Sequence, residues 1–566
     1  MTAPVDTRPA HDVPRIDPDR ARRYREAGLW RPETVGALVL DRCRHRPEAW
    51  ALVDGERRLT YGELEQAVHG AAARLRELGI APGDRVAVQL SNRVEYVVLV
   101  LALMTLGAPP VLILPAFREH ELDHILSVTR PVAFAVETGN RRFDQLGLAR
   151  RLRERHDTLR LLLVRDGTGL GPGEEDLTEL CRPRPDAVPQ PVTADPRDAA
   201  VFLLSGGTTG LPKAIPRTHE GYGYMIRTAT EIAGVSEHTV NLAVMPATHG
   251  FVMNCPGVLG TLIAGGRVVL ADPHSPRAAF ELIEREGVTH CTLVPTLVLQ
   301  WLAAAPGSPY DLGSLEVLQV GGSRLNADAA SRVRPVLGAT VQQCYGMSEG
   351  LLCFTRLDDP DEVLFHTQGR AAAPDDEIRV VDDHGMPVAP GGMGELLTRG
   401  PYTVAGYYRN AEATAGAFTE DGFYRTGDVV RLDADGNVVL EGRVRDTINR
   451  GGEKISAEEL ETIAQRHPAV AQAAGVAMPH PLYGEAVCLY VVTSGQEGVG
   501  LRELRRFLQE QGLAAYKFPE RLEIVEALPL TGIGKIDKKA LRQDVAGRLA
   551  AEAREKQEQR EKGERR

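Results

Sequence analysis

A glycine-rich loop with hydroxyl side chains and one lysine carries the clearest chemical signal in the sequence. It reads Ser205-Gly206-Gly207-Thr208-Thr209-Gly210-Leu211-Pro212-Lys213 and follows residues 199–204, an apolar run that predicts a buried strand. Glycines adopt backbone conformations that other residues avoid, so such a loop can wrap its N–H groups and the lysine charge around a polyphosphate. It is not the P-loop of NTPases, because Pro212 precedes the lysine and no serine or threonine follows it. A flexible glycine turn is the alternative interpretation.

Four further motifs follow along the chain. They are Tyr345-Gly346-Met347-Ser348-Glu349, Tyr424-Arg425-Thr426-Gly427-Asp428, Gly442-Arg443 with Asp446, and Gly532-Ile533-Gly534-Lys535. Together with the first loop, and in this order, they resemble the adenylate-forming superfamily of acyl-CoA synthetases, peptide-synthetase adenylation domains and luciferases. The resemblance extends from about Leu29 to about Leu541, and five ordered motifs make it specific.

The resemblance implies a reaction in which a carboxylate attacks the α-phosphate of ATP and pyrophosphate leaves. Both reactants are anionic, so the protein must offset charge and fix their orientation. Glu349 matches a Mg²⁺ ligand, Asp428 an acceptor of hydrogen bonds from the ribose diol, and Arg443 a second ribose or phosphate contact. The adenine and α-phosphate pocket is matched by Gly322, Cys344, Tyr345, Gly346, Met347 and Ser348.

The same resemblance assigns catalysis to a lysine near the end of the chain. Lys535 matches the lysine that bridges the attacking carboxylate and the α-phosphate, where a point charge on a flexible stem suits charge that grows in the transition state. Its neighbours alone leave open a solvated lysine in a cationic run. Arg445 matches the hinge about which the small domain of the family rotates after adenylation, and Lys454 is expected to reach the site in one of the two states.

Alternating helices and strands must position these motifs. Thr60-Tyr61-Gly62-Glu63 is a capping box, and apolar residues follow it at helical spacing. Short apolar runs predict strands at residues 85–90, 132–136, 160–164, 268–271, 291–294 and 317–320. Such alternation indicates parallel sheets covered by helices, with ligand sites at the carboxyl ends of strands. The Ser205 loop and the turn Gly321-Gly322-Ser323 both follow strands, so we expect both to face one cleft.

The predicted fold is therefore α/β with two domains and a tail. Residues 1–443 form a large N-terminal domain of parallel and mixed sheets covered by helices, with a β-barrel-like subdomain where short strands begin at residue 378. Residues 444–546 form a small, mobile α+β domain that carries the catalytic lysine. Residues 547–566 are a charged tail, interpreted as a frayed helix or a disordered segment. Residues 167–197, rich in glycine, proline and acidic side chains, are predicted to be a surface loop.

Composition narrows the class of protein. A chain of 566 residues predicts more than one domain, and a net charge of 66 − 77 = −11 argues against a general nucleic-acid binder. Seven cysteines without a CxxC pair, and an N-terminus without an apolar core, favour a cytoplasmic protein over a disulfide-bonded or secreted one. Residues 96–115 are nearly all apolar, but Gly107, Pro109 and Pro110 interrupt them, so we expect a buried helix and strand instead of a membrane span.

Further motifs narrow the substrate. Pro216-Arg217-Thr218-His219 and residues 256–260, 449–454 and 513–517 resemble the stand-alone aryl-acid–AMP ligases, which activate 2,3-dihydroxybenzoate or salicylate in siderophore assembly. An amino-acid adenylation domain has an aspartate for the substrate amine at the pocket position where this chain reads His249-Gly250-Phe251. A free α-amino acid is therefore not the expected substrate.

The pocket departs from the dihydroxybenzoate pattern. By resemblance His249 lies near the carboxylate of the acid, and Phe251 and Gly322 line the ring. Gly250 replaces the usual asparagine that bonds the 2-hydroxyl, while Cys255 and Leu352 resemble the salicylate-type lining. A thiol is a weak hydrogen-bond partner, so a 3-hydroxyl would be poorly served. We predict salicylate, anthranilate, or a hydroxylated or methylated relative, and a weakened site could also be promiscuous.

The predicted function is that of an aryl-acid–AMP ligase that uses ATP and Mg²⁺. It would pass the aryl group to the phosphopantetheine thiol of a carrier protein acting in trans, in a pathway to a siderophore or another nonribosomal product such as an antibiotic. No nucleic-acid or membrane partner is expected, and the chain is a monomer or a homodimer. Two alternatives stay open: an acyl-CoA ligase, and a non-catalytic nucleotide or acyl binder, against which Glu349, Asp428 and Lys535 argue.

Overall fold

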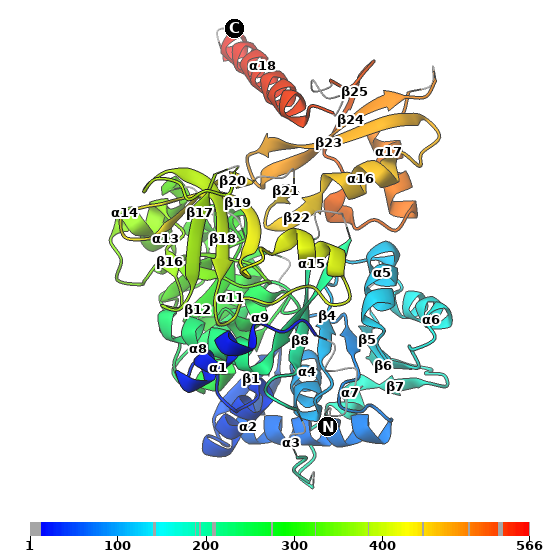
Figure 1. Cartoon of the computed structure of the whole chain (residues 1–566), viewed down its shortest axis with the longest axis vertical. Helices are drawn as coiled ribbons and strands as arrows, with labels where there is room; N and C mark the ends of the chain where they lie inside the picture. The colour runs from blue at the N-terminus through cyan, green and yellow to red at the C-terminus, as the bar shows by residue number, and fades with distance from the viewer. Residues whose placement is uncertain are drawn as a thin grey trace. The chain divides into compact units, whose positions relative to one another are not determined.

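The structure, a computed structural model, describes residues 13–564 except 140–142, 187, 192–193, 207–210, 273–274, 323, 326, 383, 444–446, 496–497 and 530–535. The chain forms two compact units. The first comprises Met1–Pro115, Asp123–Ser205 and Lys213–Gly442, and the second comprises Ala116–Leu122, Gly206–Pro212 and Arg443–Arg566. Each unit has its own sheets (Figure 1). Each also has its own buried core.

One large sheet of the first unit has seven strands. Their order is β7 (Glu174–Asp176), β6 (Leu161–Arg165), β5 (Ala133–Glu137), β3 (Val86–Val88), β4 (Pro110–Leu112), β8 (Ala199–Gly206) and β9 (Pro212–Thr218). All pairings from β7 to β8 are parallel. The predicted strand before the glycine-rich loop is confirmed as β8, and the loop joins it to β9.

The other large sheet has nine strands. Their order is β16 (Arg370–Ala371), β15 (Leu352–Phe354), β14 (Thr340–Gly346), β13 (Val317–Val320), β12 (His290–Leu293), β10 (Val240–Ala243), β11 (Arg267–Leu270), β1 (Trp50–Asp54) and β2 (Arg57–Thr60). Strands β14 to β1 pair in parallel, and antiparallel strands lie at both edges. The apolar runs from residue 85 to residue 320 are thus confirmed as strands of two mainly parallel sheets.

Helices cover both sheets because their apolar residues recur at helical spacing. One core cluster joins strands of the two sheets to α2 (Val35–His45), α3 (Tyr61–Glu77), α4 (Val94–Leu106), α8 (His219–Ile232) and α10 (Gly257–Ala264). A second cluster covers the other face of the nine-stranded sheet with α11 (Pro276–Glu286), α12 (Pro295–Ala304) and α13 (Ala327–Leu337). The period of two in β11 shows the division, since Val268 and Leu270 belong to the first cluster and Val269 to the second.

The remaining helices of the first unit are shorter or lie at its surface. They are α1 (Pro18–Glu26), α5 (Glu119–Thr129), α6 (Gln145–Arg155), α7 (Leu177–Leu180), α9 (Gly250–Asn254), α14 (Asp361–His366) and α15 (Ala411–Ala417). Of these, α5 begins within the residues grouped with the second unit.

Local signals in the N-terminal part are confirmed. The hydroxyl of Thr60 accepts a hydrogen bond from the Glu63 N–H at 3.2 Å, and the Glu63 carboxylate accepts one from the Thr60 N–H at 2.8 Å, which is the predicted capping box. The apolar stretch from residue 96 forms most of α4, a fully buried helix, followed by β4. Among the described residues, the structure has no helix of the length and apolarity that a membrane crossing requires.

The prediction of a surface loop over residues 167–197 is wrong in part. Residues Glu174–Asp176 form the edge strand β7, and α7 follows with Leu177 and Leu180 buried. The Glu174 carboxylate is buried and accepts two hydrogen bonds of 2.7 Å from the guanidinium of Arg150 on α6. The ion pair with Arg150 compensates the charge of Glu174, so this charged stretch can form a strand. Its polar composition did not predict one.

The predicted β-barrel-like subdomain is, in the described residues, a four-stranded sheet. Its order is β17 (Glu377–Val381), β18 (Met393–Arg399), β19 (Tyr424–Leu432) and β20 (Val438–Arg443). The four strands lie side by side in Figure 1. The strand β19 carries the predicted Tyr424–Asp428 motif, so this small sheet presents it to the rest of the first unit.

The second unit is α+β, as predicted for the C-terminal region. Its sheet has β22 (Glu453–Ser456), β21 (Thr447–Arg450), β24 (Gly484–Thr493), β23 (Val470–His480) and β25 (Arg521–Ile524). Alternate residues of β24 face α16 (Ala457–Ala464) and α17 (Leu501–Glu510) on one side and α18 (Lys538–Glu564) on the other. Residues 547–564 of the predicted tail are helical and belong to α18.

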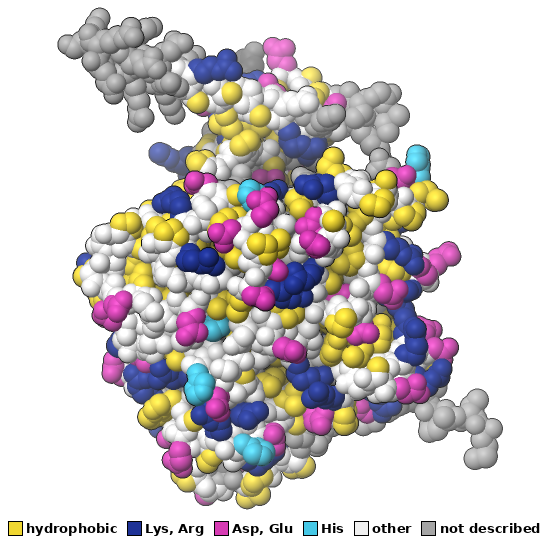
Figure 2. Space-filling model, turned by 90° about the vertical axis from the view of Figure 1, so that its left-hand side faces the viewer, with side chains coloured by type: hydrophobic (Ala, Val, Ile, Leu, Met, Phe, Trp, Pro, Cys, Tyr) yellow, Lys and Arg dark blue, Asp and Glu magenta, His cyan; other side chains and the backbone are white. Residues whose placement is uncertain are grey.

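Charges of both signs alternate over the face of the molecule in Figure 2. Lysine and arginine side chains stand between aspartate and glutamate side chains, and the side chains described on this face form no basic stripe. Such mixing gives this face no electrostatic footprint of the kind that binds nucleic acid.

Candidate active site

Glu349 follows β14 in the sequence and lies among tyrosines. Glu349 is only 4% exposed, and its Oε1 accepts a hydrogen bond of 2.9 Å from the Tyr407 hydroxyl. The hydroxyls of Tyr407 and Tyr424 are 3.4 Å apart. Burial, together with the Glu349 charge, holds the pKa of both hydroxyls well above their usual range. Both tyrosines therefore keep their protons, and Tyr407 acts as a donor to the carboxylate.

Lys213 brings a cation to the same group. It follows the glycine-rich loop on β9, and its ammonium lies 4.4 Å from the centre of the Tyr407 ring. A cation over an aromatic face is attracted by the ring quadrupole. Tyr407 thus contacts the lysine with its ring and Glu349 with its hydroxyl, so the two ends of one side chain organise opposite charges.

Asp428 lies on β19, four residues after Tyr424. The residue is 5% exposed, and its Oδ2 accepts a hydrogen bond of 2.8 Å from the Tyr345 hydroxyl. Burial and this carboxylate hold the pKa of Tyr345 well above its usual range. The charges of Glu349 and Asp428 both act on Tyr424, so the two predicted carboxylates share one tyrosine-rich neighbourhood.

In part of the predicted acid pocket, the Phe251 ring lies close to the backbone of Gly321. A methyl group in place of the Gly321 hydrogen would lie 2.7 Å from the Phe251 ring and 3.0 Å from the Cys344 carbonyl oxygen. Only glycine leaves room for that ring. The next residue, Gly322, has a φ of 84°, in the left-handed region that favours glycine. The turn after β13 is therefore shaped to hold Phe251 against the nucleotide motif.

Leu352 and Gly346 close another side of this region. They are partners in the antiparallel pair of β14 and β15, and a methyl group on Gly346 would lie 2.5 Å from Leu352 Cδ2. Leu352 belongs to the same buried cluster as Cys255 and Cys344. The electrostatic effect of Cys255 on the pKa of the Cys344 thiol indicates that these two residues are near each other, and Leu352 pairs with Gly346, so Cys255 and Leu352 both lie beside the Tyr345–Glu349 motif.

The segment from His249 to Cys255 forms the short helix α9 and its ends. His249 is exposed and precedes the helix, and its Nδ1 accepts a hydrogen bond of 3.2 Å from the Phe251 N–H. Cys255 is buried, and this burial raises the pKa of its thiol to about 12, so the thiol stays protonated. Cys255 is therefore a neutral wall and not a nucleophile.

Several polar residues beside the pocket were missed by sequence reasoning. Asn254 is 2% exposed, and its Oδ1 accepts a hydrogen bond of 2.7 Å from the Tyr222 hydroxyl. Arg217, also 2% exposed, donates to the Ser348 carbonyl at 2.7 Å and to the Met225 sulfur at 3.1 Å. The motif around Arg217 was recognised, but nothing in the sequence indicated that its guanidinium is buried behind Ser348.

Other predicted residues cannot be placed in this site. Those that lie outside the described residues are Gly207, Thr208, Thr209, Gly210, Arg445 and Lys535. Only the backbone is described for three more: Gly206 ends β8, Arg443 ends β20, and Lys454 pairs with Asn449 between β22 and β21. Ser205 is half-buried in β8, directly before the loop.

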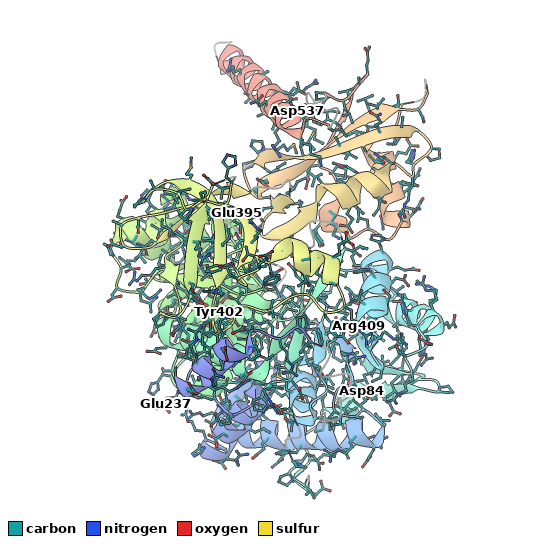
Figure 3. All side chains as sticks on the ribbon, in the orientation of Figure 1. Asp84, Glu237, Glu395, Tyr402, Arg409 and Asp537 are labelled. Atoms are coloured by element: carbon teal, nitrogen blue, oxygen red, sulfur yellow. The ribbon has the colours of Figure 1, made fainter. Side chains whose placement is uncertain are left out.

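A cavity of ≈ 250 Å³ lies elsewhere in the first unit. Its walls include Trp30, Arg217, Tyr222 and Tyr402, the last of which is labelled in Figure 3. None of the residues predicted to bind the nucleotide or the acid lines this cavity. We therefore do not assign it to the predicted reaction.

Comparison with known proteins gives consistent matches along the chain. Residues 39–408 match the AMP-binding enzyme family, and residues 459–535 match the AMP-binding enzyme C-terminal domain. The 2-hydroxy-7-methoxy-5-methyl-1-naphthoate–CoA ligase of Streptomyces carzinostaticus is 48% identical over 96% of this chain and 98% of its own length. The 2,3-dihydroxybenzoate-AMP ligase of Bacillus subtilis is 46% identical over 94% of this chain and 97% of its own. The apo structure of Mycobacterium smegmatis MbtA has a TM-score of 0.72 at 42% identity, over 94% of this chain and 98% of that one.

Proposed function

Because the chain belongs to the AMP-binding enzyme family, the ATP-dependent adenylate-forming ligases, we propose that it activates an aromatic carboxylic acid. A carboxylate oxygen of the acid forms a bond to the α-phosphorus of ATP, the bond between the α-phosphorus and the bridging oxygen breaks, and pyrophosphate leaves. A thiol then attacks the carbonyl carbon of the aryl-AMP, and AMP leaves. The observation that carries the proposal is the placement of Glu349 and Asp428 in one cluster of tyrosines, beside the Phe251 region, where each carboxylate accepts a hydrogen bond from a tyrosine hydroxyl and both act on Tyr424.

In this proposal the tyrosine cluster holds the nucleotide-binding groups in place. Asp428 accepts hydrogen bonds from the ribose hydroxyls while Tyr345 fixes its Oδ2. Lys213, on the strand after the glycine-rich loop, offsets phosphate charge. Gly322, Cys344, Gly346, Met347 and Ser348 line the purine and the α-phosphate, and Ser205 to Gly210 surround the outer phosphates. Donors that are fixed before the reaction stabilise developing charge without reorganisation.

Mg²⁺ fits a site with one protein carboxylate. Mg²⁺ commonly keeps several waters and binds one or two carboxylates together with substrate phosphates. The described residues hold no group of three or more His, Cys, Asp or Glu side chains that could form a metal cage, whereas Glu349 offers a buried carboxylate oriented by Tyr407. The ion, when bound, would neutralise phosphate charge, and Glu349 would hold it.

The acid is, in this proposal, a benzoate or larger aryl acid with a group beside its carboxylate. By their names, the naphthoate–CoA ligase and the dihydroxybenzoate ligase both act on acids with a hydroxyl at carbon 2, although their rings differ in size. Phe251, Gly322, Leu352 and Cys255 would line the ring, with His249 near the carboxylate. Since Cys255 is a protonated thiol, it would form only a weak hydrogen bond with a 3-hydroxyl of the acid. We expect salicylate or anthranilate to be used in preference to 2,3-dihydroxybenzoate.

The thiol that receives the aryl group has two candidates. We favour the phosphopantetheine of a carrier protein in trans, in a siderophore or another nonribosomal pathway, as the aryl-acid ligase motifs imply. Coenzyme A is the second candidate, because the relative from Streptomyces carzinostaticus is named a CoA ligase. Incubation of the preformed aryl-AMP complex with each thiol in turn, followed by mass analysis of the thioester, separates the two.

Pyrophosphate exchange tests the first half of the reaction. The enzyme with ATP, Mg²⁺ and a panel of substituted benzoates and 2-hydroxy-1-naphthoate should exchange labelled pyrophosphate into ATP. Lys535→Ala should lower the exchange rate at least about a hundredfold while ATP binding changes little, because the lysine acts on transition-state charge. Arg445 would act as the hinge of the change of state that follows, Lys454 would reach the site in one of the two states, and Arg443 would contact the ribose or a phosphate. An unchanged rate in the Lys535 variant would contradict the role proposed for Lys535, and no exchange with any acid would end the proposal in favour of the non-catalytic binder.

A further inference from the structure

The place of Gly250 is bounded by one polar and one apolar side chain. A methyl group on Gly250 would lie 3.3 Å from Asn254 Oδ1 and 3.3 Å from Leu203 Cδ1. Asn254 comes one turn later on α9, so its amide reaches back beside the glycine. The volume that a side chain at position 250 would enter therefore has an amide oxygen on one side and methyl groups on the other.

The partners of the Asn254 amide fix which way it points. Its Nδ2 faces two sulfur atoms, Cys255 Sγ at 3.2 Å and Met225 Sδ at 4.0 Å, and its Oδ1 accepts from Tyr222. A thioether can only accept, so the amide nitrogen must face Met225 and the oxygen must face Tyr222 and Gly250.

The amide oxygen has capacity for one more donor. A carbonyl-type oxygen has two lone pairs, and among the described residues Tyr222 is the one donor to Asn254 Oδ1. The residue is 2% exposed, so water gives it little compensation in the folded protein. A buried acceptor with a spare lone pair, 3.3 Å from the position that a methyl group on Gly250 would take, is suited to a hydroxyl or amino group of a ligand.

We propose that Asn254 determines specificity, by accepting a hydrogen bond from an O–H or N–H group on the ring carbon next to the carboxylate of the acid. The inference rests on the proposed function, because it concerns the same acid pocket. Asn254 lies one turn further along α9 and supplies the polar contact that Gly250 lacks. The substrate class is therefore ortho-hydroxy or ortho-amino aryl acids, and Leu203 contributes only an apolar surface.

Matched acids separate hydrogen bonding from size. Salicylate and 2-methylbenzoate fill similar space beside the carboxylate, but only salicylate carries a donor. In pyrophosphate exchange, the unmodified enzyme should have a kcat/KM at least about tenfold higher for salicylate than for 2-methylbenzoate, the usual worth of one buried hydrogen bond. Asn254→Leu, which keeps the approximate volume, should bring this ratio close to one. The ratio is measured within each protein, so a smaller active fraction does not alter it.

A buried amide elsewhere provides the control variant. Gln319 on β13 donates to Gln342 at 2.9 Å, and Gln319→Met removes this hydrogen bond without touching Asn254. That variant should retain the salicylate preference. The inference is overturned if the unmodified enzyme uses both acids equally, a result that needs no variant to fold, or if Asn254→Leu keeps the preference or Gln319→Met loses it. Absence of exchange with every acid would instead refute the proposed function.

Discussion

Removal of the Tyr407 hydroxyl tests how the tyrosine cluster prepares Glu349. In Tyr407→Phe the ring stays beneath Lys213, while Glu349 Oε1 loses its donor at 2.9 Å. A hydrogen bond to a charged group contributes roughly 1.5–3 kcal/mol, and that range corresponds to about 10- to 150-fold in a rate or an affinity. We expect kcat/KM for ATP with Mg²⁺ to fall within this range and KM for the acid to change by less than about twofold, since Tyr407 has no described contact with the acid pocket.

Tyr424→Phe serves as the comparison, because the Tyr424 hydroxyl is 3.4 Å from Tyr407 and forms a longer contact within the same cluster. Pyrophosphate exchange at varied ATP, at varied Mg²⁺ and at varied acid measures the three dependences separately. Because burial and Glu349 keep Tyr407 protonated, no alkaline loss of activity should be assignable to it below about pH 10. A Tyr407→Phe enzyme within about twofold of the unmodified rate, or one that loses only acid affinity, would refute this reasoning.

Three further substitutions test neighbouring parts of the account. Gly321→Ala should raise KM for the acid and leave KM for ATP nearly unchanged, because its methyl group would lie 2.7 Å from the Phe251 ring; equal effects on both substrates would contradict this placement. Arg217→Met should lower the rate of adenylation about tenfold or more, because the hydrogen bond to the Ser348 carbonyl is lost. The free energy of unfolding should change little, since no carboxylate of the described residues is paired with that guanidinium. Exchange assays measure the first effect and urea titration the second. Burial raises the pKa of Asp376 to about 7, so the folded protein binds a proton there that the unfolded chain releases near pH 4. The free energy of unfolding should therefore fall as pH rises from about 4 to about 7. Asp376→Asn should flatten this part of the stability curve, measured by denaturant at several pH values.

The order of elements could be predicted because its signals are local. Apolar runs of four to six residues, the Thr60 capping box and the switch to short strands near residue 378 all depend on neighbours in sequence. The prediction for residues 167–197 was partly wrong because β7 depends on Arg150, 24 residues before Glu174. A charged segment becomes a strand when a distant partner neutralises it, and a single sequence gives no sign of that pairing.

The candidate site shows the same division. Motif residues such as Glu349, Asp428 and Phe251 could be named from sequence, since each stands in a recognisable local pattern. Their partners could not, because Tyr407 is 58 residues from Glu349 and Tyr345 is 83 residues from Asp428. Asn254 was missed because it ends an otherwise apolar turn, and because its proposed role depends on the missing side chain at Gly250.

The path of one oxygen atom tests the central claim most directly. An ortho-hydroxy aryl acid labelled with ¹⁸O in its carboxylate is incubated with the enzyme, ATP and Mg²⁺, and the aryl-AMP is then released with a thiol. If a carboxylate oxygen attacks the α-phosphorus, the AMP recovered must carry one labelled oxygen, as mass spectrometry would show. Unlabelled AMP, or ADP in place of AMP, would contradict the proposed reaction.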